Sequence, residues 1–306
     1  MKYTWRIVGH EKLVQGLEDD ITSGNIAHAY LFAGPEKVGK FTVAKTFAHI
    51  LQCENNFCHT CQTCLQIEKN AHPDTIVFRD NNESIKIGDI RTIIDRLNLS
   101  APSKYKIFIA ENIERMTDEA GNCLLKTLEE PPPNTIFLFT TVYLKSVMPT
   151  ILSRVRVLKF HHCPEAVLVK HLTNMYPETD AATIEQIGKF ALGKPGVAFD
   201  LINDPQLASN YKTLYTDLQR FLDYESIFDR FLYIKEAEND PRKIANILDI
   251  LTHIIRTRMI SGAPYRKPYI EILEKIDYTN YLLKHNINPK LALENLMLNL
   301  GKIHFT

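Results

Sequence analysis

Residues Ala29–Thr42 read AYLFAGPEKVGKFT, and this stretch decides how the first half of the chain is interpreted. The apolar run AYLFA is followed by Gly34, four further residues, Gly39 and Lys40, and a helical pattern then begins. Glycines in such a loop let backbone N–H groups close around phosphate oxygens, and the lysine reaches the β- and γ-phosphates. The stretch therefore predicts a phosphate-binding loop. The alternative is a glycine-containing turn between strand and helix that carries a surface lysine.

The residue after Lys40 departs from the pattern of a hydrolysing loop. That position normally offers a hydroxyl to Mg²⁺, but here it is Phe41. Thr42 lies about 100° further round the predicted helix and faces elsewhere. The sequence thus indicates descent from a phosphate site, and it leaves open whether ATP binds.

A second apolar run, KIFIA at Lys106–Ala110, leads into Glu111 and Asn112. In P-loop ATPases of this kind, an Asp at the first position helps to hold Mg²⁺, and a Glu at the second polarises the attacking water. Glu111 can still contact a metal ion, but the Asn112 amide has no basic carboxylate. Because a positioned general base is worth on the order of 10²–10⁴-fold in rate, the pair predicts a domain that does not hydrolyse ATP.

Short apolar runs alternate with helical patterns over the first half of the chain. Four runs read as strands buried on both faces: Ala29–Gly34, Asp74–Arg79, Lys106–Glu111 and Thr135–Thr141. The helical patterns around them are Glu11–Ser23, Lys40–Leu51, Ile87–Leu97 and Thr117–Glu130. Strands that alternate with helices predict an α/β domain with a parallel, doubly wound sheet.

The pattern changes after the run VRVLKF at Val155–Phe160, and from Pro164 onward only helical periodicity is found. A short helical group is interrupted at Gly193–Gly196, and a longer group begins near Pro205. We therefore expect three domains: an α/β domain at 1–162, a small helical domain at 163–204 and a helical C-terminal domain at 205–306. Apolar stripes on the last helices are by default core.

Four of the six cysteines fall within twelve residues, at Cys53, Cys58, Cys61 and Cys64. Thiolates at these spacings can form a tetrahedron around Zn²⁺ and leave no position open for water, which is typical of a structural site. A redox Cys-x-x-Cys pair and disulfides are the alternatives, and the clustered quartet argues against the former. The sequence therefore predicts a zinc module at 53–64, with His59 as a neighbour of the ligands.

Charge and hydropathy limit the partners that the chain can have. Lys plus Arg equals Asp plus Glu at 36 each among 306 residues, so no global field attracts nucleic acid, and any DNA contact needs a local patch. No apolar run approaches the length that spans a bilayer, and the N-terminal residues lack the apolar segment of a secretion signal. We expect a cytoplasmic protein without a membrane partner, whose thiols stay reduced.

Several stretches together carry a resemblance to a known family: IVGHEKLVQGL, IAHAYLFAGPEKVGK, MTDEAGNCLLKTLEEPPPNTIFLFTT and ILSR. They cover most of residues 6–160 and resemble the AAA+ subunits of the bacterial replicative clamp loader, and LLKTLEEPP is highly specific. The motor subunits of that family, gamma and tau, would carry Thr after Lys40 and Asp-Glu at 111–112. Because the chain departs at all three positions, it is more similar to the delta-prime subunits.

The resemblance implies roles for particular residues. Ser153-Arg154-Val155 stands where the family has Ser-Arg-Cys, whose Arg acts as an arginine finger in a neighbouring subunit's nucleotide site. The alternative for Arg154 is an exposed arginine paired with a carboxylate. The Gly193–Gly196 segment resembles the family's second sensor region, with Lys194 as the nearby cation. The family also carries a four-cysteine zinc module, a helical lid domain and a C-terminal oligomerisation collar.

The implied function is that of a subunit of the DNA polymerase III holoenzyme. It would help to load the sliding clamp onto primed DNA, together with gamma/tau and delta subunits, without hydrolysing ATP itself. An active ATPase subunit of the same machine, of the gamma/tau type, is the alternative. An AAA+ adaptor outside replication is a third interpretation, against which the LLKTLEEPP block argues.

Overall fold

The structure of the protein, a computed structural model, describes residues 3–55, 57–81, 83–99, 102–223, 227–237, 240–260, 266–284 and 287–300. The chain forms two units. The first comprises Met1–Glu178 with Gly193–Val197, and the second comprises Thr179–Leu192 with Ala198–Thr306. The division predicted from the sequence, into 1–162, 163–204 and 205–306, stays a prediction.

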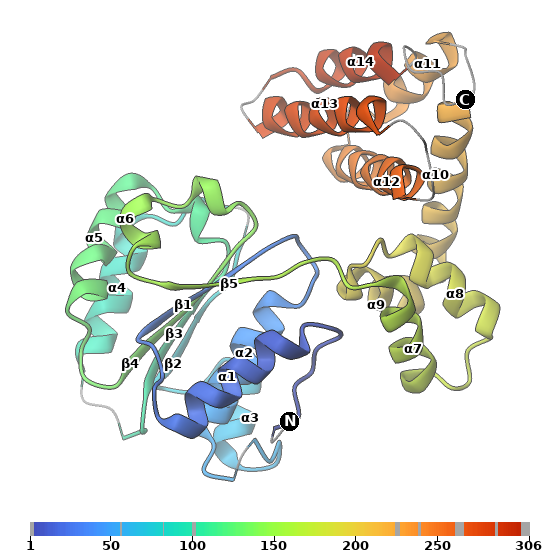
Figure 1. Cartoon of the computed structure of the whole chain (residues 1–306). Helices are drawn as coiled ribbons and strands as arrows, with labels where there is room; N and C mark the ends of the chain where they lie inside the picture. The colour runs from blue at the N-terminus through green and yellow to red at the C-terminus, as the bar shows by residue number, and fades with distance from the viewer. Residues whose placement is uncertain are drawn as a thin grey trace. The chain divides into compact units, whose positions relative to one another are not determined.

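A five-stranded parallel sheet forms the centre of the first unit, in the order β2-β3-β4-β1-β5 (Figure 1). Its strands are β1 Ala29–Ala33, β2 Thr75–Phe78, β3 Lys106–Ala110, β4 Thr135–Thr141 and β5 Arg156–Lys159. The first four are the strands predicted from the sequence, and β1 and β4 are buried at every residue. The edge strand β5 is partly exposed, so its pattern lacked the continuous apolar run that marks a central parallel strand.

Helices cover both faces of this sheet. Tyr30 and Phe32 of β1 point into a core shared with α1 Glu11–Ser23 and α2 Lys40–Gln52. Leu31, between them, points into the opposite core, shared with α4 Ile87–Asn98 and α5 Asp118–Glu129. Because successive strand residues face opposite sides, a strand covered on both sides must be apolar throughout, which is why the predicted runs were continuous.

The boundaries of the predicted helices are confirmed to within a residue or two. Helix α5 begins after Thr117, whose hydroxyl accepts a hydrogen bond from the Ala120 N–H at 3.3 Å. Asp118 and Glu119 occupy its first turn, where carboxylates are favoured by the helix dipole. The helix ends at Glu129, shortly before the three prolines at 131–133 that cannot continue it. Short helices α3 Gln62–Glu68 and α6 Pro149–Leu152, and one-turn helices η1 Ile113–Arg115 and η2 Leu144–Ser146, complete the connections.

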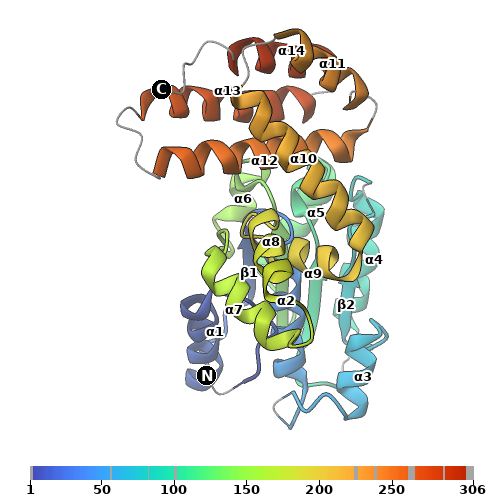
Figure 2. The same cartoon turned by 90° about the vertical axis from the view of Figure 1, so that its right-hand side faces the viewer.

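The regular elements that the structure describes after β5 are all helices, as predicted. Helix α7 Glu165–Met175 belongs to the first unit, α8 Ala181–Phe190 to the second, and α9 Pro195–Asn203 begins in the first and continues in the second. The second unit continues with α10 Pro205–Asp223, α11 Ile227–Ala237, α12 Pro241–Ile260, α13 Lys267–Lys284 and α14 Pro289–Leu300 (Figure 2). No helix in the described part of the chain is long and apolar enough to cross a membrane.

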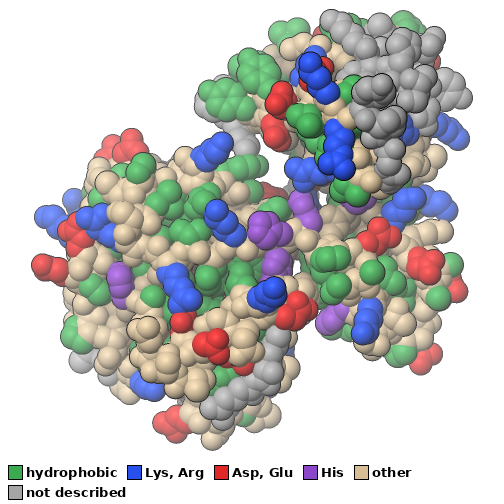
Figure 3. All heavy atoms as spheres, in the orientation of Figure 1, with side chains coloured by type: hydrophobic (Ala, Val, Ile, Leu, Met, Phe, Trp, Pro, Cys, Tyr) green, Lys and Arg blue, Asp and Glu red, His purple; other side chains and the backbone are tan. Residues whose placement is uncertain are grey.

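The apolar stripes of the second unit are divided between core and surface. Residues such as Ile247, Leu251 and Leu293 are fully buried, as the default interpretation expected. Phe228, Ile260 and Leu291 are instead exposed over 74%, 76% and 61% of their surface. On the face drawn in Figure 3, basic and acidic side chains of the first unit are interspersed, in keeping with a formal net charge of zero.

A candidate phosphate site and a four-cysteine cluster

The loop between β1 and α2 has the backbone of a phosphate-binding loop. Gly39 precedes the first residue of α2 in the left-handed region, at φ 98°, where a side chain would be strained. A Cβ on Gly34 would lie 2.4 Å from the Phe160 carbonyl oxygen, and the Gly34 N–H donates to the Thr141 carbonyl at 3.1 Å. Both glycines named from the sequence are therefore required by the geometry of the loop.

Lys40 lies inside this loop and binds its backbone. The Nζ atom donates to the carbonyls of Gly34 and Pro35, at 2.7 and 2.6 Å, and the residue is only 7% exposed. Burial lowers the pKa of Lys40 to about 8, against the raising effect of Glu114 and other nearby carboxylates. An ammonium has three protons, so two of its three donor positions are taken by the loop itself.

The Gly193–Gly196 segment packs against the same loop. The Gly196 N–H donates to the Lys37 carbonyl at 2.8 Å, and the Gly193 carbonyl accepts from the Cys163 N–H at 2.8 Å. Lys194 is buried and its charge acts to lower the pKa of Lys40. The segment that resembled a sensor region is thus placed beside the loop.

Phe41 is covered by an arginine that the sequence reasoning had not singled out. The guanidinium carbon of Arg79, at the end of β2, lies 4.0 Å from the centroid of the Phe41 ring. This is within the range of a cation–π contact. Phe41, which stands where a hydroxyl was expected, therefore contacts a positively charged side chain of the protein itself.

Glu111 is joined to the same arginine. Its Oε1 accepts from Arg79 Nη1 at 3.1 Å, and its Oε2 accepts from the Asp80 N–H at 3.1 Å. Both carboxylate oxygens therefore have a partner within the protein. The metal contact predicted for Glu111 from the sequence stays a prediction.

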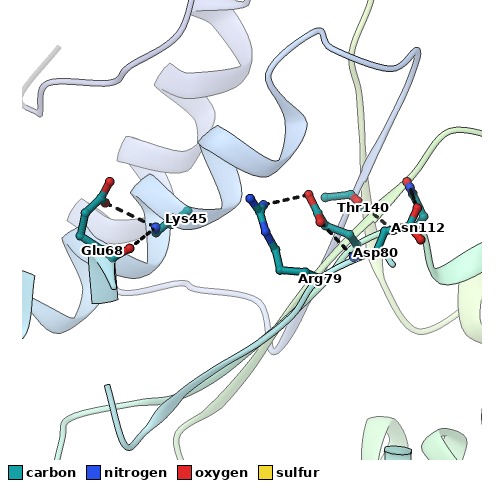
Figure 4. A network of polar contacts seen from close by, with 7 residues as sticks. Lys45, Glu68, Arg79, Asp80, Asn112 and Thr140 are labelled. Atoms are coloured by element: carbon teal, nitrogen blue, oxygen red, sulfur yellow. Dashed lines mark hydrogen bonds and ion pairs between the residues drawn. The ribbon is translucent and has the colours of Figure 1, made fainter. Parts of the chain in front are cut away.

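Asn112 has a structural set of hydrogen bonds. Its amide nitrogen donates to Asp80 Oδ2 at 2.6 Å, and its backbone N–H donates to Thr140 Oγ1 at 3.1 Å (Figure 4). The residue takes the left-handed backbone conformation, φ 51°, which Asn tolerates better than most residues. Arg115 Nε also pairs with Asp80 at 3.3 Å. Asp80 thus organises the ends of β2 and β3.

A signal for Arg79 and Asp80 existed in the sequence. They directly follow the run TIVF, and the carboxyl ends of neighbouring parallel strands meet at one edge of a sheet. Since β2 pairs with β3, the polar residues after both strands are brought together.

The four cysteines come together as predicted. The Sγ atoms of Cys53, Cys58, Cys61 and Cys64 all lie within 4.8 Å of one another. Cys53 Sγ is 3.8 Å from both Cys58 Sγ and Cys61 Sγ. A Zn–S bond of about 2.3 Å in a tetrahedron requires sulfurs about 3.8 Å apart, whereas a disulfide requires about 2.05 Å. The residues therefore fit a four-thiolate metal site, and all four are free cysteines.

The cluster is held between α2 and α3. Cys53 follows the last residue of α2, and Cys61 caps the start of α3 by accepting from the Cys64 N–H at 3.4 Å. Lys45 and Glu68 join the two helices, with 3.5 Å between Nζ and Oε2 (Figure 4). The His59 ring contacts that of Phe57, with ring centroids 3.8 Å apart and the ring planes tilted by 43°, and His59 is not among the clustered ligand residues.

Arg154 lies just after α6 and is paired with a carboxylate. Its Nη2 is 2.5 Å from Glu129 Oε1, while Nη1 donates to the Thr150 carbonyl and Ser153 Oγ at 2.8 and 2.9 Å. One third of the Arg154 side chain is exposed. Arg156 differs, because it pairs with Asp20 of α1. The two arginines, which charge alone could not separate, thus have distinct partners.

A parallel sheet whose first strand leads through a glycine loop and a buried lysine into a helix defines the P-loop α/β class. Within that class, residues 9–164, just over half of the 306, match the family described as DNA polymerase III, delta subunit. The chain belongs to this family.

Two relatives of the chain are themselves subunits of DNA polymerase III. The chain is 29% identical over 210 residues to DNA polymerase III subunit gamma of Buchnera aphidicola, covering 66% of this chain and 58% of that protein. It is 34% identical over 160 residues to subunit tau of Escherichia coli, covering 51% of this chain and 24% of that protein. The chain thus spans less than two thirds of the length of either relative. A solved structure of a DNA polymerase III gamma subunit-related protein from Thermotoga maritima is 19% identical, with a TM-score of 0.48 over 94% of this chain and 98% of that one.

Proposed function

We propose that the chain is a delta-prime-like, non-hydrolysing AAA+ subunit of the DNA polymerase III clamp loader, which helps to load the sliding clamp onto primed DNA. The observation that carries the proposal is Asn112. The side chain at the position of the general base is an amide, and its nitrogen is already bound to Asp80 at 2.6 Å. Loss of the base alone is worth on the order of 10²–10⁴-fold in rate. Family membership supports the assignment to the polymerase.

Arg154 would act in trans at a neighbouring motor subunit. A guanidinium is permanently charged and can contact two phosphate oxygens at once, and its pairing with Glu129 is partly exposed to solvent. Exposed ion pairs contribute about 0–1 kcal/mol, so a γ-phosphate of the neighbour can compete with the carboxylate. Arg154 would then stabilise charge that develops during phosphoryl transfer.

Zinc would hold the module at 53–64 as a structural ion. Four thiolates close its coordination shell, so the ion would have no catalytic role. When bound, it would fix the end of α2 relative to the start of α3, the two helices that carry Cys53 and Cys61.

The partners would be the gamma/tau and delta subunits and, through the assembly, the sliding clamp and primed DNA in the cytoplasm. The exposed apolar residues of the second unit, among them Phe228, Ile260 and Leu291, would contribute to the oligomerisation collar. Residues 163–204 would serve as the helical lid domain.

Reconstitution tests the proposal. Clamp loading onto primed DNA is measured for the motor, delta and clamp subunits from the same source, with and without this chain. Loading that requires the chain, together with no ATP turnover by the isolated chain, supports the assignment. ATP hydrolysis by the purified chain alone would favour the gamma/tau-type ATPase, and loading that proceeds equally well without the chain would remove the clamp-loading role.

A further inference from the structure

Arg79 lies between the two positions that hold Mg²⁺ in a hydrolysing P-loop site. One is the position after the loop lysine, here Phe41. The other is the acid that directly follows β3, here Glu111. The Arg79 guanidinium lies 4.0 Å from the Phe41 ring centroid and 3.1 Å from Glu111 Oε1. A cation that belongs to the protein thus contacts both positions at once.

The register of the sheet fixes this arrangement. Phe78 of β2 is paired with Ala110 of β3, and the Glu111 N–H donates to the Phe78 carbonyl at 3.1 Å. Arg79 and Glu111 therefore leave the two strands side by side. The Asp80 N–H holds the second oxygen of Glu111, so the carboxylate is oriented toward Arg79 by backbone as well as by charge.

The strength of the ion pair alone does not exclude Mg²⁺, because 56% of the Arg79 side chain is exposed and exposed pairs are weak. The coordination requirement is the stronger argument. Mg²⁺ demands a near-octahedral shell of oxygens and dehydrates reluctantly. Phe41 supplies no oxygen, and Glu111 Oε1 is bound by the Arg79 guanidinium, whose positive charge repels a cation at the same oxygen.

We propose that Arg79 is a built-in cation that takes the place of Mg²⁺ at this site, so that the site excludes the divalent ion. A nucleoside triphosphate that enters would bind without metal, with Lys40 and Arg79 as its cations. The inference rests on the proposed function, because it explains how a site of P-loop ancestry stays intact without hydrolysing ATP. It also explains why Phe41 and Arg79 occur together. The Phe41 ring makes a cation–π contact with Arg79, whereas the hydroxyl expected at that position would bind a metal ion.

The test is binding of a fluorescent ATP analogue to the isolated chain, with Mg²⁺ or with EDTA. The variants are Phe41→Thr, Arg79→Ala and the double variant, and Arg91→Ala is the matched control because it removes an exposed guanidinium on α4, outside this set of contacts. The wild type and the control should show no gain of affinity from Mg²⁺. The double variant should gain at least about tenfold, because a bound metal ion stabilises phosphate charge strongly. Phe41→Thr alone should gain much less.

Three results would overturn the inference: Mg²⁺-strengthened binding by the wild type, an equal gain in Phe41→Thr with Arg79 present, or no gain in a folded double variant. Circular dichroism establishes folding, and Arg79→Gln in the double background replaces Arg79→Ala if the latter is unfolded. ATP hydrolysis is measured on the same samples. Turnover by the wild type contradicts the proposed function, whereas Mg²⁺-dependent binding without turnover contradicts only the role of Arg79.

Discussion

Arg154 and Glu129 form an ion pair that joins the segment following α6 to the last residue of α5, with 2.5 Å between Nη2 and Oε1. Both belong to the stretches that carried the resemblance to clamp-loader subunits, ILSR and LLKTLEEPP. The pair therefore links the proposed finger to the most specific motif of the chain. Under the proposed role of Arg154, a phosphate of the neighbouring subunit would have to compete with the Glu129 carboxylate for the Nη2 donor.

Arg154→Ala is expected to slow DNA-stimulated ATP turnover in a reconstituted loader. Turnover at the neighbouring site should fall by on the order of 10³ or more, because an arginine finger is worth that much in related phosphoryl-transfer sites. Arg91→Ala, which removes an exposed arginine on α4, is the control and should leave turnover unchanged. Full turnover with Arg154→Ala would exclude the role in trans.

Glu129→Gln separates pairing from catalysis. The substitution removes the charge that competes for Arg154 and keeps the shape of the side chain. Turnover should be retained, and the free energy of unfolding should change by no more than about 1 kcal/mol, since the pair is partly exposed. A loss of turnover as large as that of Arg154→Ala would mean that the carboxylate itself is needed to position the finger.

The cysteine cluster predicts one zinc ion per chain and a region that depends on it. Elemental analysis should find about one equivalent, and removal by a chelator should lower the unfolding temperature, because metal binding energy is folding energy. Cys61→Ser should lose the metal, while Cys123→Ser, outside the cluster, should keep it. Metal content well below one equivalent in freshly purified protein, or equal loss in both variants, would contradict the prediction.

The sequence was most informative where both faces of an element are buried. The runs that became β1 and β4 are apolar throughout because helices cover both sides, so their pattern could be recognised without any partner. The edge strand β5, with exposed Arg156 and Lys159, has no such pattern and was not predicted as a strand. The cysteine cluster was also predictable, since its four ligands lie close together along the chain.

The partners of the site residues were not predictable in the same way. Phe41 and Glu111 were both recognised as departures from a hydrolysing site, but the residue that joins them lies on a third segment of the chain. Arg79 reaches Phe41 and Glu111 only because β2 pairs with β3 in one register. Likewise, Arg154 and Arg156 looked equivalent as charges, and only their contacts with Glu129 and Asp20 distinguish them.

Lys40 predicts a pH dependence of stability. Its pKa is lowered to about 8 in the folded chain, whereas an unfolded lysine has a pKa of about 10.4. Between these values the unfolded chain binds more protons at this site, so the contribution of Lys40 to the free energy of unfolding rises with pH. The slope is at most about 1.4 kcal/mol per pH unit.

Urea unfolding of the wild type and Lys40→Met from pH 7 to pH 10 measures this contribution. The free energy of the wild type should rise relative to that of the variant above about pH 8, the value to which burial lowers the pKa. Lys12→Met, which replaces an exposed lysine of α1, should not alter the profile. A wild-type curve parallel to that of Lys40→Met would show that the lysine keeps an ordinary pKa in the folded chain.

Gly34→Ala tests whether the loop is as closely packed as the structure requires. The new Cβ would lie 2.4 Å from the Phe160 carbonyl oxygen, and Phe160 cannot easily withdraw because its N–H donates to the Ala33 carbonyl at 2.7 Å. Unfolding should become easier by about 1–3 kcal/mol, as for other overpacked sites. Gly16→Ala is the control, since a Cβ there meets nothing within 4 Å and alanine stabilises a helix interior by about 0.8–1 kcal/mol over glycine. Thermal unfolding of both variants should therefore shift in opposite directions, and an unchanged midpoint for Gly34→Ala would mean that the loop can move away from β5.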